Sequence, residues 1–355
     1  MRILVLYTEL AAYILSSFKS FLDSNTGAEM LIVHYPINAE APFEFKSLNN
    51  ANLTTYQADK TTIINEEINR FKPEIILCSG WGNTFYLKVV KQYHGSAKTV
   101  LCFDNRWNGS LKQRLLASTS KFNFLKTFKY CWVAGNPQAV YAKKLGFKSE
   151  NIYTGLYTAD NDLFQFIGKE KLKLKGVYPK KIICVARYIP QKDLPTLWKA
   201  FINVNTKFDN RWHLDCFGNG ILFENIIENV NIKHHGFVQP SDMSSYLLES
   251  GFFVLPSLSE PWGVVVQEMA LSALPMILSN SIGAATEFLD ATNGFSFEAG
   301  NQEDLEKQLS ILMDKTDEQL WEMAQNSWEN GMKHKKEDWV KTMLEIYNNN
   351  KNVWN

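Results

Sequence analysis

Short apolar runs rich in β-branched residues alternate along the chain with longer segments in which apolar residues recur at helical spacing. This alternation is typical of parallel α/β architecture, in which a helix follows each strand and covers the sheet. In the first half of the chain, strands are predicted at residues 3–7, 30–34, 74–78, 99–103 and 130–134. Helices are predicted between them at residues 11–22, 86–93, 111–118 and 138–145.

The alternation is interrupted at residues 165–180, which are rich in lysine, contain two glycines and lack apolar periodicity. A second series follows, with strands predicted at residues 181–186, 213–217, 232–235, 252–256 and 276–279. Its helices are predicted at residues 194–204, 221–229, 243–248, 264–273 and 305–313.

The predicted fold class is therefore α/β, with two Rossmann-like parallel α/β domains facing a central cleft. We expect the N-terminal domain over residues 1–164, a linker over residues 165–180 and the C-terminal domain over residues 181–335. Residues 336–355 are expected to form a C-terminal helix that folds back towards the N-terminal domain.

The composition favours a soluble two-domain protein. A chain of 355 residues with 45% apolar and 21% charged residues suits two domains of ordinary size. No apolar run approaches the roughly 20 residues of a membrane span, and Thr8 and Glu9 interrupt the first apolar stretch too early for a signal peptide. Five scattered cysteines without a CxxC pair are typical of reduced thiols, so we expect a cytoplasmic location.

The charges balance overall but not locally. The 37 basic and 37 acidic residues cancel, which gives no reason to expect nucleic acid as a partner. Residues 88–150 nevertheless hold twelve basic residues against only Asp104 and Glu150. The simpler interpretation is a set of solvated helix faces. The alternative is a positive surface that contacts the inner face of an anionic membrane peripherally, or a lipid-linked phosphate acceptor.

Two glutamates flank the junction between an apolar strand and a helix in the second half of the chain. Glu260 and Glu268 are eight positions apart, and Gly263 between them leaves backbone N–H groups at the helix start open to an anion such as a diphosphate. Two surface carboxylates are the alternative interpretation. The preceding strand, the Pro-Trp-Gly turn and the small-residue helix favour a site for a ligand with hydroxyl groups at both ends and phosphate between them, as in a nucleotide sugar.

Two cations stand at the end of an earlier apolar strand. Arg187 directly follows this strand, and Lys192 precedes a helix. The planar guanidinium of arginine can bridge two phosphate oxygens, while lysine supplies a compact charge. Such a pair would neutralise a diphosphate leaving group without a metal. Two solvated loop cations are the alternative, which fits Lys192 better than Arg187.

Together, these clusters resemble the C-terminal domain of the retaining GT-B glycosyltransferases of glycosyltransferase family 4, over about residues 180–300. That family has an arginine, a lysine five residues later, and an E-x7-E motif followed by a small-residue helix. Arg187 and Lys192 match the cation pair, and Glu260 and Glu268 match the two glutamates.

The resemblance implies a role for each matching residue. Arg187 and Lys192 would hold the donor diphosphate, Glu260 the donor sugar and Glu268 the ribose hydroxyls. The other donor-binding candidates that the resemblance implies are Gly263, Val264, Val265, Gly218, Asn219 and Glu287.

The N-terminal domain departs from the family pattern. Residues 8–13 replace the usual glycine-rich loop. Many family members have a histidine after the fourth or fifth strand that contacts the donor sugar, and Asp104 stands at the comparable place; a structural turn or cap is the alternative. Arg106 is a candidate for an acceptor phosphate or a plain surface cation, and Trp81 for the lining of an acceptor cleft or a tight turn.

Neither a metal nor a bound cofactor is expected, because the six histidines show no metal-ligand spacing with cysteines or carboxylates. The predicted function is transfer of a sugar from a nucleotide-diphosphate sugar to an acceptor hydroxyl, with retention of configuration implied by the resemblance. The expected acceptor is a glycan or lipid-linked saccharide of cell-surface polysaccharide synthesis. A sugar-nucleotide 2-epimerase on the same fold and a GT-B protein that binds sugar nucleotide or glycan without catalysis are the alternatives.

Overall fold

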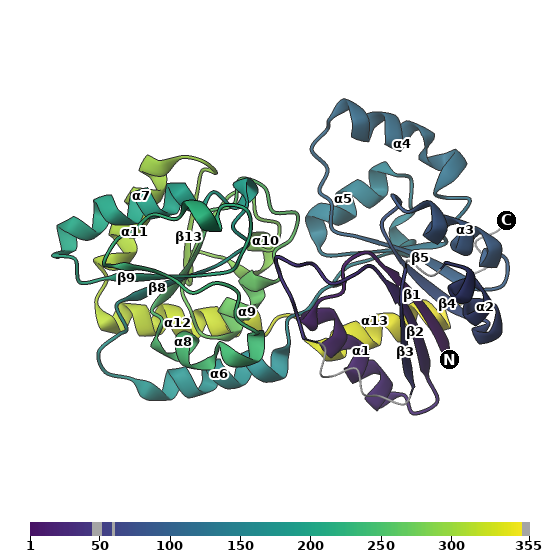
Figure 1. Cartoon of the computed structure of the whole chain (residues 1–355), viewed down its shortest axis with the longest axis horizontal. Helices are drawn as coiled ribbons and strands as arrows, with labels where there is room; N and C mark the ends of the chain where they lie inside the picture. Colours follow the sequence, from purple (N-terminus) through teal and green to yellow (C-terminus); the bar gives the residue numbers. More distant parts are fainter. Residues whose placement is uncertain (45–51, 59–60, 350–355) are drawn as a thin grey trace. The chain divides into compact units, whose positions relative to one another are not determined.

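The computed structural model describes residues 1–44, 52–58 and 61–349, and the chain divides into two compact units (Figure 1). Unit 1 comprises residues 1–37, 45–158 and 335–355. Unit 2 comprises residues 38–44 and 159–334. Each unit is built around one sheet, and all strand pairs in both sheets are parallel within the described residues.

The sheet of unit 1 has the strand order β3-β2-β1-β4-β5-β6-β7. Its strands are β1 (Arg2–Tyr7), β2 (Glu29–His34), β3 (Leu53–Gln57), β4 (Ile75–Ser79), β5 (Lys98–Phe103), β6 (Tyr130–Val133) and β7 (Ile152–Tyr153). Its helices are α1 (Ala12–Ser24), α2 (Thr61–Phe71), α3 (Thr84–Tyr93), α4 (Leu111–Asn123), α5 (Asn136–Lys144) and α13 (Lys336–Asn348).

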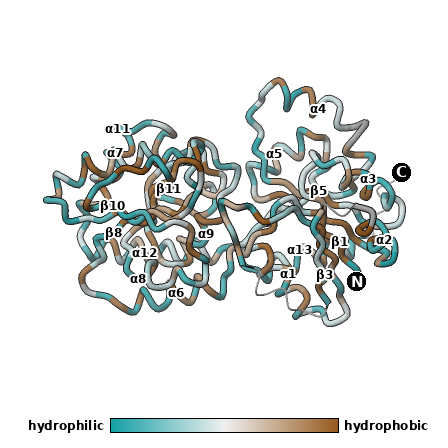
Figure 2. The backbone as a smooth tube through the Cα atoms, in the orientation of Figure 1, coloured by the Kyte–Doolittle hydropathy of each residue, from teal (hydrophilic) through white to brown (hydrophobic). Residues whose placement is uncertain are grey.

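Both faces of this sheet are covered, as the apolar strands require. Successive side chains of a strand point to opposite faces. Ile3 and Val5 accordingly lie in the core beneath α1 and α13, while Leu4 and Leu6 lie in the core on the side of α2, α3 and α5. Figure 2 shows the resulting concentration of apolar residues along β1 and its neighbours.

The C-terminal helix α13 completes the core of unit 1. It lies beside α1 (Figure 1), and its Trp339 is 1% exposed. The indole Nε1 donates to the carbonyl of Leu156 at 3.0 Å, and the ring packs against Trp132 with centroids 4.8 Å apart. A segment from the end of the chain thus supplies a central side chain of the first unit.

The sheet of unit 2 has the order β10-β9-β8-β11-β12-β13, a doubly wound arrangement in which the order reverses beside β8. Its strands are β8 (Lys181–Val185), β9 (His213–Phe217), β10 (Ile232–His234), β11 (Phe252–Leu255), β12 (Met276–Ser279) and β13 (Gly294–Phe297). Its helices are α6 (Asn161–Leu174), α7 (Leu194–Asn205), α8 (Ser244–Glu249), α9 (Val265–Leu271), α10 (Ala285–Phe288), α11 (Gln302–Met313) and α12 (Asp317–Gly331). Helices α7 and α11 pack together on one face of this sheet, and α6, α8, α9 and α12 cover the other (Figure 1).

The segment that we expected to be a linker, residues 165–180, is largely helical in the structure. Residues up to Leu174 form most of α6, a part of unit 2. Gly168 does not break this helix but allows it to approach α9, because a Cβ at this position would lie 2.0 Å from the carbonyl oxygen of Leu271. Phe164 and Ile167 of this helix are buried, and so is Lys171, whose Nζ donates to the carbonyls of Leu247 and Leu248 at 3.2 Å and 3.1 Å.

The helix predicted at residues 221–229 is also wrong, since only a 3₁₀ turn, Phe223–Asn225, forms there. The amide of Leu222 donates to the carbonyl of Tyr188 at 2.8 Å, so this segment is held against the loop after β8 instead of forming a helical ladder. The helix predicted at residues 264–273 is shorter than expected, because Ala273 takes a left-handed conformation with φ +57°.

Besides α6, the elements outside the predicted set include β3, α2, β7, α10 and β13. The sequence of α2 contains a helical pattern, since Ile64 and Ile68 are about one turn apart and both are buried. The strands are short, and β13 begins at a glycine. Such segments give too few positions for alternation to be recognised.

Candidate functional site

The donor-site candidates of unit 2 lie in loops at the carboxyl edge of its sheet. Backbone hydrogen bonds join these loops: the amide of Tyr188 donates to the carbonyl of Asn219 at 2.8 Å, and that of Leu258 to Gln191 at 2.8 Å. Gly218, with φ +131°, allows the closest approach, because a Cβ there would lie 2.0 Å from the carbonyl oxygen of Ala186. The loops after β8, β9 and β11 therefore form one continuous backbone layer.

Lys192 and Glu260 meet in this layer. The Nζ of Lys192 donates to Oε2 of Glu260, and the two side chains are only 15% and 13% exposed. The backbone around Glu260 is fixed by its bridge to Ile282 and by the amide of Gly283, which donates to the Glu260 carbonyl at 3.0 Å. The structure thus brings together two residues that are 68 positions apart in the sequence.

Gly263 is required by this arrangement. Its φ of +92° lies in the region that favours glycine, and a Cβ would lie 2.9 Å from Cγ of Glu260. The turn therefore folds closely around the glutamate side chain. Val264 and Val265 follow at the start of α9 and are partly exposed.

Arg187 lies in the same loop layer but has a different partner. Its Nη1 lies 3.4 Å from Oε2 of Glu40, with side-chain exposures of 40% and 31%. Glu40 belongs to the short segment 38–44 that is part of unit 2. This contact was not foreseen from the sequence, because nothing in the residues around Glu40 links them to the second sheet.

Glu268, on α9, has a perturbed acidity. Burial raises the pKa of its carboxyl to about 7, and the negative charge of Asp160 adds to the shift. This carboxyl is therefore near the midpoint of its titration at neutral pH. A ligand that donates hydrogen bonds to this carboxyl would favour its ionised form and lower its pKa.

The residue beside it, Gln267, was missed by the sequence reasoning and is buried at 1% exposure. Its Oε1 accepts from the amide of Ala159 at 2.8 Å, and its Nε2 donates to the carbonyl of His334 at 2.7 Å. Ala159 and His334 are the residues at which the chain enters and leaves the main part of unit 2. One amide side chain on α9 therefore holds both crossing points.

Glu287, on α10, contacts the last residue of unit 2. Its Oε2 lies 2.5 Å from Nε2 of His334, and its side chain is 11% exposed.

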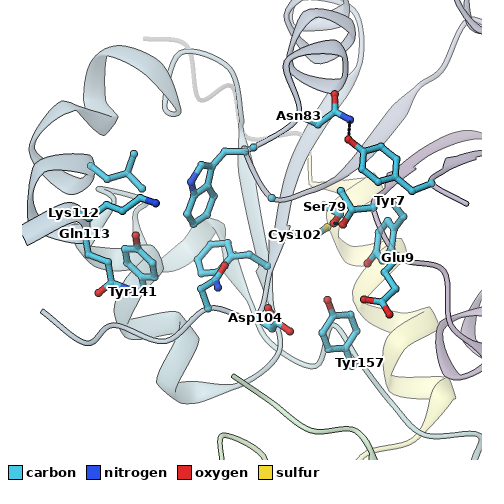
Figure 3. Close-up of a pocket in the computed structure, with 18 of the residues that line it drawn as sticks. Tyr7, Glu9, Ser79, Asn83, Cys102, Asp104, Lys112, Gln113, Tyr141 and Tyr157 are labelled. Atoms are coloured by element: carbon cyan, nitrogen blue, oxygen red, sulfur yellow. Dashed lines mark hydrogen bonds between the residues drawn. The ribbon is translucent and has the colours of Figure 1, made fainter. Parts of the chain in front are cut away.

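Unit 1 contains a pocket of about 680 Å³ at the carboxyl ends of β1, β4 and β5 (Figure 3). Asp104 and Trp81, both predicted site residues, line it. Arg106 does not belong to the described lining, although it directly follows Asn105, which does. Its backbone carbonyl instead accepts from Gln113 Nε2 at 2.7 Å.

The pocket has two chemically different ends, which Figure 3 shows. Glu9 and Asp104 lie at the end that contains Tyr7 and Tyr157, while Lys112 lies at the other. Burial raises the pKa of both Tyr7 and Tyr157, and the charge of Asp104 contributes to both shifts. The Asp104 carboxylate therefore acts on both phenols.

Tyr7 also lines the pocket, and it was missed in the sequence analysis because it ends an ordinary apolar strand. Its side chain is 3% exposed, and its hydroxyl has no hydrogen-bond partner among the described residues. Buried hydroxyls without partners are rare in folded proteins.

The last two features concern metal binding and membrane insertion. In residues 1–44, 52–58 and 61–349, no cluster of three or more histidines, cysteines or carboxylates is arranged to hold a metal ion. None of the helices in the same ranges combines the length and the apolar composition that crossing a bilayer needs.

Comparison with known proteins gives a family match within unit 2 and a fold match over nearly the whole chain. Residues 169–334 match the family model described as glycosyl transferases group 1. An uncharacterized glycosyltransferase of Methanocaldococcus jannaschii is 26% identical over 191 residues, which cover 52% of this chain and 51% of the relative. The chain thus spans about half the length of this curated relative.

Two solved structures match almost the full length. A glycosyltransferase from Rickettsia africae has a TM-score of 0.73 at 14% identity and covers 98% of this chain and 97% of its own. The Anabaena protein HepE, in complex with UDP and glucose, has a TM-score of 0.73 at 14% identity, with 97% and 98% covered. The fold is therefore that of the GT-B proteins, and the prediction of two Rossmann-like parallel α/β domains is confirmed.

Proposed function

We propose that this protein transfers a glycosyl group from a nucleotide-diphosphate sugar to an acceptor hydroxyl. The observation that carries the proposal is the Lys192–Glu260 pair, held by a fixed loop layer inside the region that matches the group 1 glycosyl transferases. The fold similarity to a protein solved with UDP and glucose supports the nucleotide sugar as donor class.

The donor would lie along the carboxyl edge of the unit 2 sheet. Lys192 and Arg187 would bind the diphosphate, and each would exchange its present carboxylate partner, Glu260 or Glu40, for phosphate oxygens. Glu260, released from Lys192, would then be free to accept hydrogen bonds from the donor sugar. The base would lie near Gly218 and Asn219.

Glu268 would bind the ribose, with the backbone of Gly263, Val264 and Val265 beside the phosphates. An ionised carboxylate can accept a hydrogen bond from a vicinal hydroxyl at each oxygen, whereas the protonated form carries a donor on one of them. Its pKa of about 7 makes this contact dependent on pH. Glu287, whose Oε2 contacts His334, would be a further donor-binding residue.

In the proposed reaction, the bond between the anomeric carbon and the diphosphate oxygen breaks and a bond to the acceptor oxygen forms. The electron pair of the broken bond goes to the diphosphate, and the acceptor proton is transferred to the leaving phosphate. Configuration at the anomeric carbon is retained in this proposal. Arg187 and Lys192 stabilise the negative charge that develops on the leaving group without a metal.

The acceptor would bind in the pocket of unit 1, lined by Trp81 and Asp104. Asp104 would contact the reacting sugars in place of the family histidine. We propose a glycan or lipid-linked saccharide of cell-surface polysaccharide synthesis as the acceptor. Arg106, outside the described lining, would at most contact a distal part of it.

A peripheral membrane contact on the cytoplasmic side is part of this proposal. On α4, Leu111 and Leu115 are 84% and 68% exposed and are flanked by Lys112 and Arg114. Exposed apolar residues next to basic ones suit an anionic lipid surface. Co-sedimentation with phosphatidylglycerol vesicles, but not with phosphatidylcholine vesicles, is expected, and equal recovery with both would contradict it.

Thermal-shift measurement with a panel of nucleotide-diphosphate sugars tests the donor class. A ligand that binds only the native state raises the melting temperature. At least one nucleotide sugar should do so, and its effect should be lost in Arg187→Ala. Products formed without an acceptor would instead indicate an epimerase, and binding without transfer to any acceptor a non-catalytic protein.

A further inference from the structure

We propose that the unit 1 pocket selects a saccharide acceptor by the charge of one ring. The ring at the end of the pocket beside Tyr7, which we call the inner end, must carry no negative charge, and Tyr7 and Glu9 are the residues that select it. This inference rests on the proposed function, since it names the chemical class of the acceptor. It concerns side chains that the sequence resemblance leaves unassigned. The pocket, which measures about 680 Å³, is within the range of sites that bind small molecules.

The lining suits a carbohydrate. Trp81 and Tyr141 present aromatic rings, packed edge to face with centroids 6.0 Å apart. The C–H groups of a sugar ring form an apolar face that packs on such rings, while the hydroxyls at its edge need polar partners. The side chains of Asn83, Asn108 and Gln113 supply amide groups along the same lining.

The hydroxyl of Tyr7 is the second, independent observation. It is buried, it lines the pocket and it has no partner among the described residues. A buried hydroxyl without a partner carries a desolvation cost that a ligand hydroxyl would remove. This points to a hydroxyl-bearing ligand at the inner end of the pocket rather than an apolar one.

The charges at the two ends determine which saccharide fits. The carboxylates of Glu9 and Asp104 lie at the inner end with Tyr7 and Tyr157, and Lys112 lies at the opposite end (Figure 3). Sugar hydroxyls can donate to carboxylates, whereas a uronate or phosphate placed there would be repelled. A negative group on the acceptor is therefore compatible only with the outer end, near Lys112.

The test compares two probes on the full chain by isothermal titration. One is a neutral hexose disaccharide, and the other is the same disaccharide with a uronic acid in place of each hexose, so that either orientation puts a carboxylate at the inner end. The neutral probe should bind about tenfold more tightly, because the uronate loses favourable contacts and meets like charge. Equal or tighter binding of the uronate would overturn the inference, as would the failure of the neutral probe to bind.

Two conservative variants connect the preference to its residues. Tyr7→Phe keeps the ring and removes only the unpartnered hydroxyl, so the melting temperature should stay unchanged or rise. The affinity for the neutral probe should fall about fivefold. Glu9→Gln removes one carboxylate charge, so the ratio of the affinities for the neutral and the uronate probe should fall about fivefold. Glu150→Gln, an exposed carboxylate of unit 1 outside the described lining, is the matched control and should change neither value.

Failure of this inference is distinguishable from failure of the proposed function. If a nucleotide sugar stabilises the protein and the neutral disaccharide does not bind, the acceptor class is wrong and the donor proposal stands. If the disaccharide binds with the stated preference and no nucleotide sugar binds, the pocket assignment stands and the transferase proposal is overturned. Unchanged affinity in Tyr7→Phe would remove Tyr7 from the site.

Discussion

At the scale of single residues, the proposed donor site of unit 2 contains two glutamates in different surroundings. Glu260 contacts Lys192, whereas burial raises the pKa of Glu268 to about 7. The two glutamates of one sequence motif therefore have different surroundings. The E-x7-E spacing alone could not reveal this, because the difference arises from dehydration and from Asp160.

The acidity of Glu268 gives the first prediction. Because its pKa in the folded protein lies above its ordinary value near 4.3, the folded state binds the extra proton between about pH 4.3 and pH 7. The stability contributed by this group is therefore present at low pH and is lost as the pH rises through about 7. Between pH 5 and pH 8, the melting temperature of the wild type should thus fall more than that of Glu268→Gln.

Donor affinity should have the opposite dependence, since binding of ribose hydroxyls needs the ionised carboxylate. Wild-type affinity for a nucleotide sugar should rise between pH 6 and pH 8, and the affinity of Glu268→Gln should be weaker and nearly constant. Equal pH profiles for the two proteins would exclude Glu268 from the donor site.

The Lys192–Glu260 pair gives a second prediction. Lys192→Met keeps most of the side-chain stem but leaves a largely buried carboxylate without its partner, which should lower the free energy of unfolding by about 1–3 kcal/mol. Urea unfolding would measure this. The double variant Lys192→Met/Glu260→Gln should lose less than the sum of the two single variants, because the pair is coupled. Strict additivity would mean that the contact contributes nothing.

At the scale of elements, the candidate residues lie at the carboxyl edge of each sheet, and the helices that pack on the sheets hold the backbone in place. The strands of both sheets were largely predictable, because buried parallel strands are continuous apolar runs such as Ile75–Ser79. What the sequence could not give was the packing role of Gly168. A glycine in a lysine-rich segment indicates a break when only local pattern is considered, and its contact with Leu271 is about 100 positions away.

Gly168 provides the prediction at this scale. In Gly168→Ala, the new Cβ would lie 2.0 Å from the backbone oxygen of Leu271, so α6 and α9 must move apart. We expect a loss of about 1–3 kcal/mol or more in the free energy of unfolding. Gly95→Ala, where no atom lies within 4 Å of the added Cβ, is the matched control. Similar stability of both variants would show that the two helices are not closely packed.

The sequence indicated where the candidate residues lie in the fold but not which side chains they contact. The motif residues Arg187, Lys192, Glu260 and Glu268 lie on unit 2 as expected, but the partner of Arg187 is Glu40, from a segment near the start of the chain. Gln267 and Tyr7 could not be found from the sequence. Their roles depend on hydrogen bonds made or missing in three dimensions, and their neighbours in sequence are ordinary core residues.

At the scale of the whole molecule, each unit is completed by a segment from elsewhere in the chain. Residues 38–44 join unit 2, and α13 joins unit 1. Trp339→Ala in α13 should therefore destabilise unit 1, by about 3–5 kcal/mol, because it empties a fully packed core position. In a denaturation followed by probes in each unit, the transition of unit 1 should shift and that of unit 2 should not. Equal shifts in both would contradict this division.

The central claim is that a nucleotide-diphosphate sugar binds at the carboxyl edge of the unit 2 sheet. Hydrogen–deuterium exchange with and without a nucleotide sugar that raises the melting temperature tests it most directly. The account predicts slower exchange in residues 187–192 and 259–268, and loss of this protection in Lys192→Met. Protection confined to unit 1, or slower exchange elsewhere in unit 2 with these two loops unchanged, would contradict it.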